Sequence, residues 1–253
     1  LPICKARLWI PTSGDSPRLV LDLAIADVDA PRVVSYLPLR RFSARTSQWL
    51  RDGVLAGRVP RATLEYAGEM RRFPFRDGGG LFRVRADFDG LRLHYQDGWA
   101  DLEGARGEVE FRNQGFVAKA GTARVGGLAV EAAEARMDDY RDARLLVEAQ
   151  TRGDARQALA YVQSSPVGPR LGEFFMGVKG AGPFAADVRL DFPFRRFADR
   201  VVEVRASFDG ATARLPAIDD ELRGLVGSFV LVNRDVDVPL VTGTFLGGPF
   251  RLK

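Results

Sequence analysis

The sequence has one cysteine and one histidine, and it has no long apolar run. Cys4 alone cannot form an internal disulfide or a cysteine-based zinc site, so packing must hold the fold together. No stretch approaches the roughly 18 to 20 apolar residues that span a bilayer, and no basic and apolar signal peptide opens the chain. Because the chain begins at Leu1 without a methionine, we expect a fragment whose membrane anchor lies outside it.

An excess of one charge is also lacking. The chain has 37 Lys+Arg and 33 Asp+Glu, which gives +4, and bases alternate with acids along it. No dense cationic stripe of the kind that binds phosphates of nucleic acids is present, so we predict no nucleic-acid partner. Mild attraction to anionic lipid headgroups remains open. The 46% hydrophobic content predicts a folded chain.

The sequence also lacks a recognisable set of catalytic residues. His94 falls on the polar side of the alternating run 91–95, and a lone histidine cannot complete a Ser/His/Asp triad or a multi-histidine metal site. We predict that His94 is a surface strand residue. Cys4 has no neighbouring histidine and is interpreted as a spectator. The pairs Asp138-Asp139 and Asp219-Asp220 adjoin predicted turns, where aspartate is favoured for local backbone hydrogen bonds.

Glycine runs at 78–80 and 177–182 lack the spacing of a phosphate-binding loop followed by Lys-Ser/Thr. Hairpin turns explain them better. We therefore predict no enzyme, no cofactor and no metal.

What the sequence does contain is period-2 alternation. Apolar positions share one face of each predicted strand, and charged positions share the other, which is typical of antiparallel sheets. The alternating apolar sets are Leu19, Leu21, Leu23 and Ile25; Phe82, Val84, Ala86 and Phe88; Phe184, Ala186, Val188, Leu190 and Phe192; and Val202, Val204, Ala206 and Phe208.

Turns and short helices punctuate these strands. We predict turns at 78–80, Asp89-Gly90, Gly126-Gly127 and Asp209-Gly210. The predicted helices are Pro31 to Leu37, Ser43 to Val54 with Ser43 as N-cap, and Asp154 to Gln163 with Asp154 as N-cap. Helix is the minority element.

The chain also resembles itself at a spacing of about 120 residues. Phe73-Pro74-Phe75-Arg76 followed by 84–90 recurs as Phe192-Pro193-Phe194-Arg195 followed by 204–210. Downstream, Gly104, Gly107 and Asn113 correspond to Gly224, Gly227 and Asn233. We predict two β-rich modules, 1–130 and 131–253, which form one continuous sheet, since repeated units bury their edges against each other.

The remaining notable residues are aromatic, 17 phenylalanines, 5 tyrosines and 3 tryptophans. They predict either an ordinary closed core or an apolar face that stays open and receives acyl chains, because the helices are too few to cover so many strands. Periodicity alone leaves both possibilities open.

The order of several short motifs resembles the central region of YhdP-type proteins of the AsmA-like family, over nearly the whole chain. The motifs are Tyr36-Leu37-Pro38, Trp49-Leu50 with Gly53, Phe73-Pro74-Phe75, Gly80-Leu81-Phe82, Leu93-His94-Tyr95, Trp99, Ser165-Pro166, Gly177 with Gly180, Leu190-Asp191-Phe192-Pro193 and Leu246-Gly247-Gly248-Pro249. One position departs from the pattern: Trp99 is followed by Ala100, whereas the family has Trp-Pro there.

The resemblance implies a long periplasmic protein of Gram-negative bacteria, anchored in the inner membrane, whose repeated β structure forms a continuous hydrophobic groove. The implied partners are phospholipid or another acyl lipid, the inner and outer membranes, and envelope proteins; the implied role is phospholipid movement that supports the outer-membrane barrier. A structural or assembly module of the envelope is the alternative.

By the same resemblance, the apolar alternation positions would line the groove. The fold expected is mainly β with a few short helices, as an elongated, curved antiparallel sheet. The expected lipid-contacting residues are Leu19, Leu21, Leu23, Phe82, Val84, Phe88, Leu91, Leu93, Tyr95, Phe184, Val188, Leu190, Val202, Val204 and Phe208.

Overall fold

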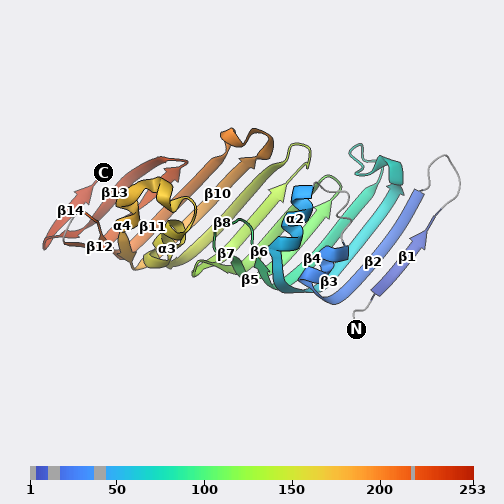
Figure 1. Cartoon of the computed structure of the whole chain (residues 1–253), viewed down its shortest axis with the longest axis horizontal. Coiled ribbons are helices and arrows are strands. Elements are labelled where there is room, and N and C mark those ends of the chain that lie inside the picture. Colours follow the sequence, from blue (N-terminus) through green and yellow to red (C-terminus); the bar gives the residue numbers. More distant parts are fainter. Residues whose placement is uncertain (1–3, 11–17, 37–43, 218–219) are drawn as a thin grey trace.

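The computed structural model describes residues 4–10, 18–36, 44–217 and 220–253, and it is dominated by one large antiparallel sheet (Figure 1). Fourteen strands belong to the sheet, and thirteen of them follow one path in chain order. Each strand of this path pairs with the one before it, because the connections are short turns, loops and helical segments that return the chain antiparallel.

The elements follow one another in simple order. The strands are β1 (Cys4–Trp9), β2 (Arg18–Asp29), β3 (Val54–Glu69), β4 (Leu81–Leu93), β5 (Leu102–Arg112), β6 (Gly115–Val125), β7 (Leu128–Met137), β8 (Arg144–Asp154), β9 (Lys179–Ala181), β10 (Pro183–Pro193), β11 (Val201–Arg214), β12 (Glu221–Val232), β13 (Asp235–Phe245) and β14 (Gly248–Leu252). The helical segments are α1 (Ala30–Tyr36), α2 (Ala44–Gly53), η2 (Met70–Arg72), α3 (Ala155–Ser164), η3 (Gly168–Leu171), α4 (Gly172–Gly177) and η4 (Phe194–Asp199).

The sheet is elongated, curved and not closed. Within the described residues β1 pairs only with β2 and β14 only with β13, so the two ends of the path do not meet. Short β9 lies off the path and pairs with β11. The predicted fold, mainly β with a few short helices in an open curved sheet, is confirmed.

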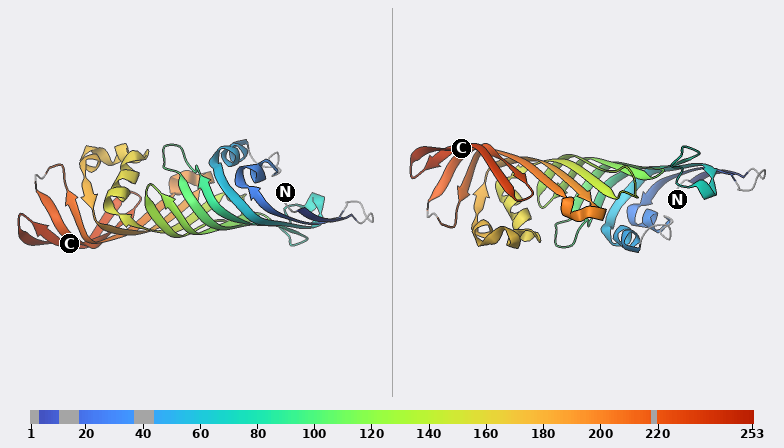
Figure 2. Two further views of the ribbon diagram at one scale, coloured as in Figure 1. Left: turned by 90° about the horizontal axis from the view of Figure 1, so that it is seen from below. Right: turned by 90° about the horizontal axis from the view of Figure 1, so that it is seen from above.

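All four α-helices lie on the same side of the sheet, as both views of Figure 2 show. They gather at the strand ends where β2 leads into α1 and β8 leads into α3, which we call the helix edge. The opposite ends of the strands carry η2, the 113–114 turn and η4, and form the turn edge. At the helix edge, Ala30 of α1 packs against Val59 and Ala62 of β3.

Backbone geometry recurs along the chain. Asn113 and Asn233 both have positive φ, 48° and 56°, and each accepts a hydrogen bond through Oδ1 from a strand amide, that of Phe82 at 2.9 Å and that of Val202 at 3.0 Å. Their own amides donate to the carbonyls of the same two residues. The division at residue 130 stays a prediction, and that residue lies inside β7, so the sheet runs on across it.

The three helices predicted from the sequence are present as α1, α2 and α3. The N-cap of α3 is confirmed: the Asp154 carboxylate accepts from the Arg156 amide, and Gln157 closes a capping box. Leu37 and Ser43 lie outside the described residues, so the predicted end of the first helix and the Ser43 cap stay untested. The short segments η2, η3, α4 and η4 were not predicted.

Two predicted turns are wrong. Asp89-Gly90 and Asp209-Gly210 lie inside β4 and β11, at irregularities in the strand pairing, where the glycines take φ of 64° and 77°. Each is a bulge that bends a continuing strand, since an Asp-Gly pair tolerates the same positive φ in a bulge as in a hairpin. The 177–182 run is not a hairpin either: it ends α4 and forms β9. Gly126-Gly127 is the β6–β7 turn, as predicted.

Candidate functional site

The most continuous feature of the molecule is one apolar sheet face, on the side that carries the helices. Two rows of directly paired residues define it, and we call it the apolar face. One row crosses nine strands through Ile25, Ala62, Ala86, Val109, Ala118, Ala135, Val147, Leu190 and Val202. The other crosses nine strands through Phe88, Gly107, Ala120, Ala133, Ala149, Val188, Val204, Leu231 and Val236.

Neither row contains a charged or hydrogen-bonding side chain. Because side chains alternate between the two faces of a strand, in-register pairing carries an apolar position from strand to strand without interruption. An unbroken row over so many strands requires that the alternation in every strand agrees with the pairing register. The predicted one-sided strands therefore combine into one surface.

The apolar face is only partly covered. The small residue Ala62 is buried, as are Ala186 and Ala206, which lie two residues from Val188 and Val204 on the same side of β10 and β11. Larger members such as Val147 and Leu190 keep part of their surface accessible. Among the described residues, Phe75 is the large side chain with less than 2% exposure. A sheet that closed its core would bury these branched side chains, so this face lacks a complete cover.

The helices cover the part of the face nearest the helix edge, and the cluster beneath α1 extends to the mid-strand positions Ile25, Ala62 and Ala86 of the first row. α1 packs on Ile25, Val54, Val59, Ala62 and nearby residues, and the glycines that α3 approaches most closely include Gly126, Gly127 and Gly153, at strand ends. Four helices at one edge cannot cover both nine-strand rows. The turn-edge half of the face therefore stays accessible.

The opposite face is charged. Directly paired positions on seven adjacent path strands form a row of Asp87, Glu108, Lys119, Glu134, Glu148, Arg189 and Glu203. Lys119 and Glu134 lie 3.8 Å apart, and Arg189 and Glu148 lie 3.9 Å apart. Exposed pairs of this kind add little stability, but a charged face stays hydrated and cannot hold hydrocarbon. The two faces of the sheet are thus chemically opposite.

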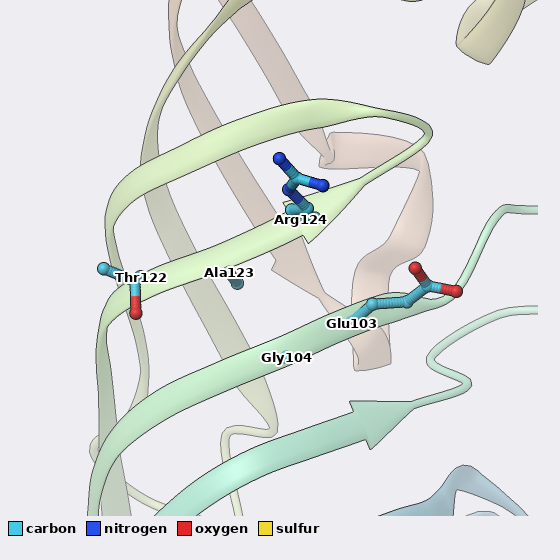
Figure 3. A pocket seen from close by; sticks show the side chains of 5 residues that line it. All are labelled: Glu103, Gly104, Thr122, Ala123 and Arg124. Carbon is cyan, nitrogen blue, oxygen red and sulfur yellow. The ribbon is translucent and has the colours of Figure 1, made fainter.

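A shallow hollow of about 410 Å³ lies between β5 and β6 and is lined by Glu103, Gly104, Thr122, Ala123 and Arg124 (Figure 3). Thr122 and Arg124 flank Ala123, whose side chain packs in the apolar cluster with Ala105 and Val130. The two polar side chains therefore lie on the charged face. This hollow is not part of the apolar face.

Metal-binding geometry is not found in the part of the chain that the structure describes: no three of its His, Cys, Asp and Glu residues group closely enough to hold an ion. In the same residues, no helix is long and apolar enough to cross a membrane.

Comparison with known proteins identifies the family of the chain. The family described as YhdP protein matches residues 4–253. The chain belongs to the YhdP family. It is 23% identical over 249 residues to the "Intermembrane phospholipid transporter YhdP" of Escherichia coli (strain K12), an alignment that covers 96% of this chain and 19% of that protein. The chain thus spans about a fifth of the relative's length, and no solved structure matches it.

With membership of the YhdP family shown, the expected lipid-contacting residues can be placed. All fifteen are half-buried. Pairing puts Phe184 opposite Phe208, Val188 opposite Val204 and Leu190 opposite Val202, and Leu91 packs with Phe88 around Ala105. Their contact with lipid stays a prediction.

Tyr95 differs from the other members of that set, because it lies beyond the end of β4. Its hydroxyl is 2.6 Å from the hydroxyl of Tyr161 in α3, and its carbonyl accepts a 3.0 Å hydrogen bond from the indole of Trp49 in α2. The Trp99 ring also stacks 5.3 Å from Tyr161. Burial raises the pKa of both tyrosines, so both hydroxyls stay protonated. The β4–β5 loop therefore ties α2 to α3 along the helix edge.

His94 begins this loop and is not a strand residue. Its Nε2 lies 2.9 Å from Asp97 Oδ1 and its Nδ1 lies 2.9 Å from Asp101 Oδ1. These hydrogen bonds, that to Asp97 first, raise the pKa of His94 above its usual value. Asp101 also pairs with Arg92 at 2.8 Å. His94 therefore links Asp97 and Asp101 within the loop, and we call these three residues the His94 clasp.

The aromatic link between the helices was missed from the sequence. Trp49, Tyr95 and Tyr161 are separated by 46 and 66 residues, and no spacing rule relates positions on a helix, a loop and a second helix. The signal that was available is their amphipathic chemistry, since buried tyrosine and tryptophan usually find a hydrogen-bond partner.

Proposed function

We propose that this segment is part of a bridge that moves phospholipid between the inner and outer membranes, with acyl chains lying on the apolar face. It would act in the periplasm, within a longer protein anchored in the inner membrane by a segment outside this chain. The E. coli relative is named as an intermembrane phospholipid transporter, and this supports the proposal. Support of the outer-membrane barrier and contacts with envelope proteins belong to the same proposal.

The observation that carries the proposal is the unbroken row from Ile25 to Val202, which crosses nine paired strands and remains half accessible at its larger positions. Each CH2 of an acyl chain that leaves water for such a surface contributes about 0.8 kcal/mol. Because the row offers the same kind of contact at every strand, the chain can shift from one strand to the next without losing its hydrocarbon environment.

The proposed mechanism is passive and has no catalytic step. Acyl chains exchange one set of apolar contacts for an equivalent one, while the headgroup stays at the hydrated rim of the sheet. Moving a headgroup across the dry face would cost several kcal/mol for an unpaired charge. The sheet therefore keeps lipid orientation fixed during movement.

A matched pair of neighbouring residues in β8 tests the proposal. Val147 lies in the apolar row, paired with Ala135 and Leu190, whereas Leu146 lies on the charged face, paired with Arg136 and Asp191. In the full-length protein, Val147→Arg should reduce phospholipid transfer to the outer membrane roughly tenfold, because a charge placed against an acyl chain costs at least about 1.4 kcal/mol. Leu146→Arg should leave transfer close to wild type.

Two readouts separate transport from folding. Labelled-phospholipid transfer in cells reports activity, and mass spectrometry of lipids bound to the purified full-length protein reports occupancy, with circular dichroism confirming that both variants fold. Equal transfer by folded Val147→Arg and wild-type protein, with no phospholipid bound to either, would favour the alternative of a structural or assembly module.

A further inference from the structure

The turn edge holds two copies of the Phe-Pro-Phe-Arg motif, and they end in different structures. In the first copy the Phe75 side chain is only 1% exposed. It fits a space left by Gly68 and Gly80, where an added Cβ would come within 2.6 Å and 2.5 Å of its ring. The following Arg76 is paired with Asp139. In the first copy Phe75 is therefore buried and Arg76 is neutralised, while Phe73 remains 39% exposed.

The second copy lies differently relative to its strand. Phe192 and Pro193 belong to β10 and Phe194 follows them directly, whereas Phe73 follows the end of β3 by four residues. Gly68 and Gly80 lie two residues beyond the paired positions Tyr66 and Phe82. The positions two residues beyond the corresponding pair, Leu190 and Val202, are Phe192 and Arg200, so the second copy has no matching pair of glycines.

Phe194 instead faces solvent in an aromatic stack. Phe192, Phe194 and Phe197 have ring centroids 5.8 to 6.5 Å apart, and Phe194 and Phe197 are 51% and 48% exposed. Phe192 belongs to the apolar face, since it follows Leu190 by two residues in β10. η4 bends to the same side of the sheet as the α-helices (Figure 2). The stack thus continues the apolar face to its rim.

Three exposed arginines, Arg195, Arg196 and Arg200, belong to the same short segment as Phe194 and Phe197. Arg200 lies over the Phe197 ring at 5.0 Å, and Arg196 approaches Asp199 only at 3.6 Å, with both side chains largely exposed. No ion pair of Arg195 is found among the described residues. An arginine that stacks on an aromatic ring keeps most of its N–H groups free to donate, and a guanidinium fork matches phosphate oxygens.

We propose that this cluster of Phe194, Phe197, Arg195, Arg196 and Arg200 is a headgroup site, which holds the phosphate of a phospholipid while its acyl chains lie on the apolar face at Phe192 and Leu190. The charge excess, three arginines against Asp199, complements an anionic phosphodiester. The aromatic stack accepts the adjoining glycerol and first methylenes. The site deepens the proposed function and rests on it.

Photocrosslinking in the full-length protein tests the site. The crosslinking residue benzoylphenylalanine replaces Phe194 in one form and Val147 in another, in cells whose phospholipids carry 32P. Both forms should become labelled. Adding Arg195→Gln, Arg196→Gln and Arg200→Gln should lower the label at position 194 roughly tenfold, since charge-assisted hydrogen bonds to phosphate are lost, and change the label at position 147 less than about twofold.

A matched charge control uses Arg61→Gln, Arg124→Gln and Arg136→Gln, three exposed arginines on the charged face, and should leave both labels unchanged. Labelling at 147 with none at 194, or equal losses from both triple variants, would overturn the headgroup site while the apolar conduit survives. Absence of label at both positions would instead count against the proposed function itself. Purified protein should also bind a fluorescent phospholipid more tightly than the matching diacylglycerol, and the η4 triple variant should remove that preference.

Discussion

At the residue scale, two glycines decide what a repeated motif becomes. Gly68 and Gly80 leave room that Phe75 fills, whereas the second copy has Phe192 and Arg200, not glycines, two residues beyond the corresponding pair Leu190 and Val202. In the first copy the buried Phe75 thus contributes to stability, whereas in the second copy Phe194 and Phe197 form an exposed surface. The sequence repeat predicted equivalent motifs, but the difference depends on which side chains meet across two strands.

This difference predicts unequal effects of one substitution. Phe75→Ala should lower the free energy of unfolding by about 3–5 kcal/mol, because it empties a fully enclosed position, whereas Phe194→Ala at the half-exposed equivalent position should cost under about 1 kcal/mol. Urea unfolding followed by circular dichroism measures both. Equal losses would show that the two aromatic side chains are packed alike.

His94 predicts a pH dependence of the β4–β5 loop. Its pKa is raised from 6.5 by hydrogen bonds to Asp97 and Asp101, so the clasp contributes stability that is fully present below pH 6.5 and is lost as the pH rises through the raised value. As the one histidine, it gives a single imidazole NMR signal to titrate. Asp101→Asn should move the midpoint downward, and a midpoint at or below 6.5 in the wild type would contradict the clasp.

At the element scale, the strands depend on close backbone approach at particular positions. Gly107 of β5 lies in an apolar row, and a Cβ there would fall 1.9 Å from the Lys119 carbonyl of β6. Gly121 of β6 has open space around its Cα. Both are glycines in the same pair of strands, but only the first is required by packing.

Gly107→Ala should therefore destabilise the chain by about 1–3 kcal/mol through overpacking, and Gly121→Ala should be neutral or slightly stabilising because it restricts the unfolded chain. Thermal unfolding of the two variants gives the comparison. Hydrogen exchange should show the loss for Gly107→Ala at the β5–β6 amides, and its absence there would place the damage elsewhere.

At the scale of the whole molecule, the proposed transport takes phospholipid past the strands one after another along the apolar rows. If phospholipid passes every strand in turn, then Val109→Arg, Val147→Arg and Val202→Arg should each reduce transfer by a similar factor, roughly tenfold, although they lie on β5, β8 and β11. Their neighbours on the other face, Glu108→Arg, Leu146→Arg and Val201→Arg, are the controls. Graded or additive partial losses among the first three would indicate entry and exit along the sheet.

Period-2 alternation by itself determined the strands, their one-sidedness and their antiparallel pairing, because the pleat ties each residue to a face; that the sheet is open was implied only by the family resemblance. Asp154 likewise marked the start of α3. Local sequence did not distinguish a bulge from a hairpin at Asp89-Gly90, since both use the same positive φ.

Only the tertiary structure decided the rest. Register across nine strands turned separate apolar stripes into one face, and helices confined to one edge left part of it accessible. The connection from β10 to β11 also placed Phe194 and three arginines in an exposed segment at the rim, whereas Phe75 fills the space beside Gly68 and Gly80. These outcomes depend on residues far apart in the chain meeting in space, which no local pattern encodes.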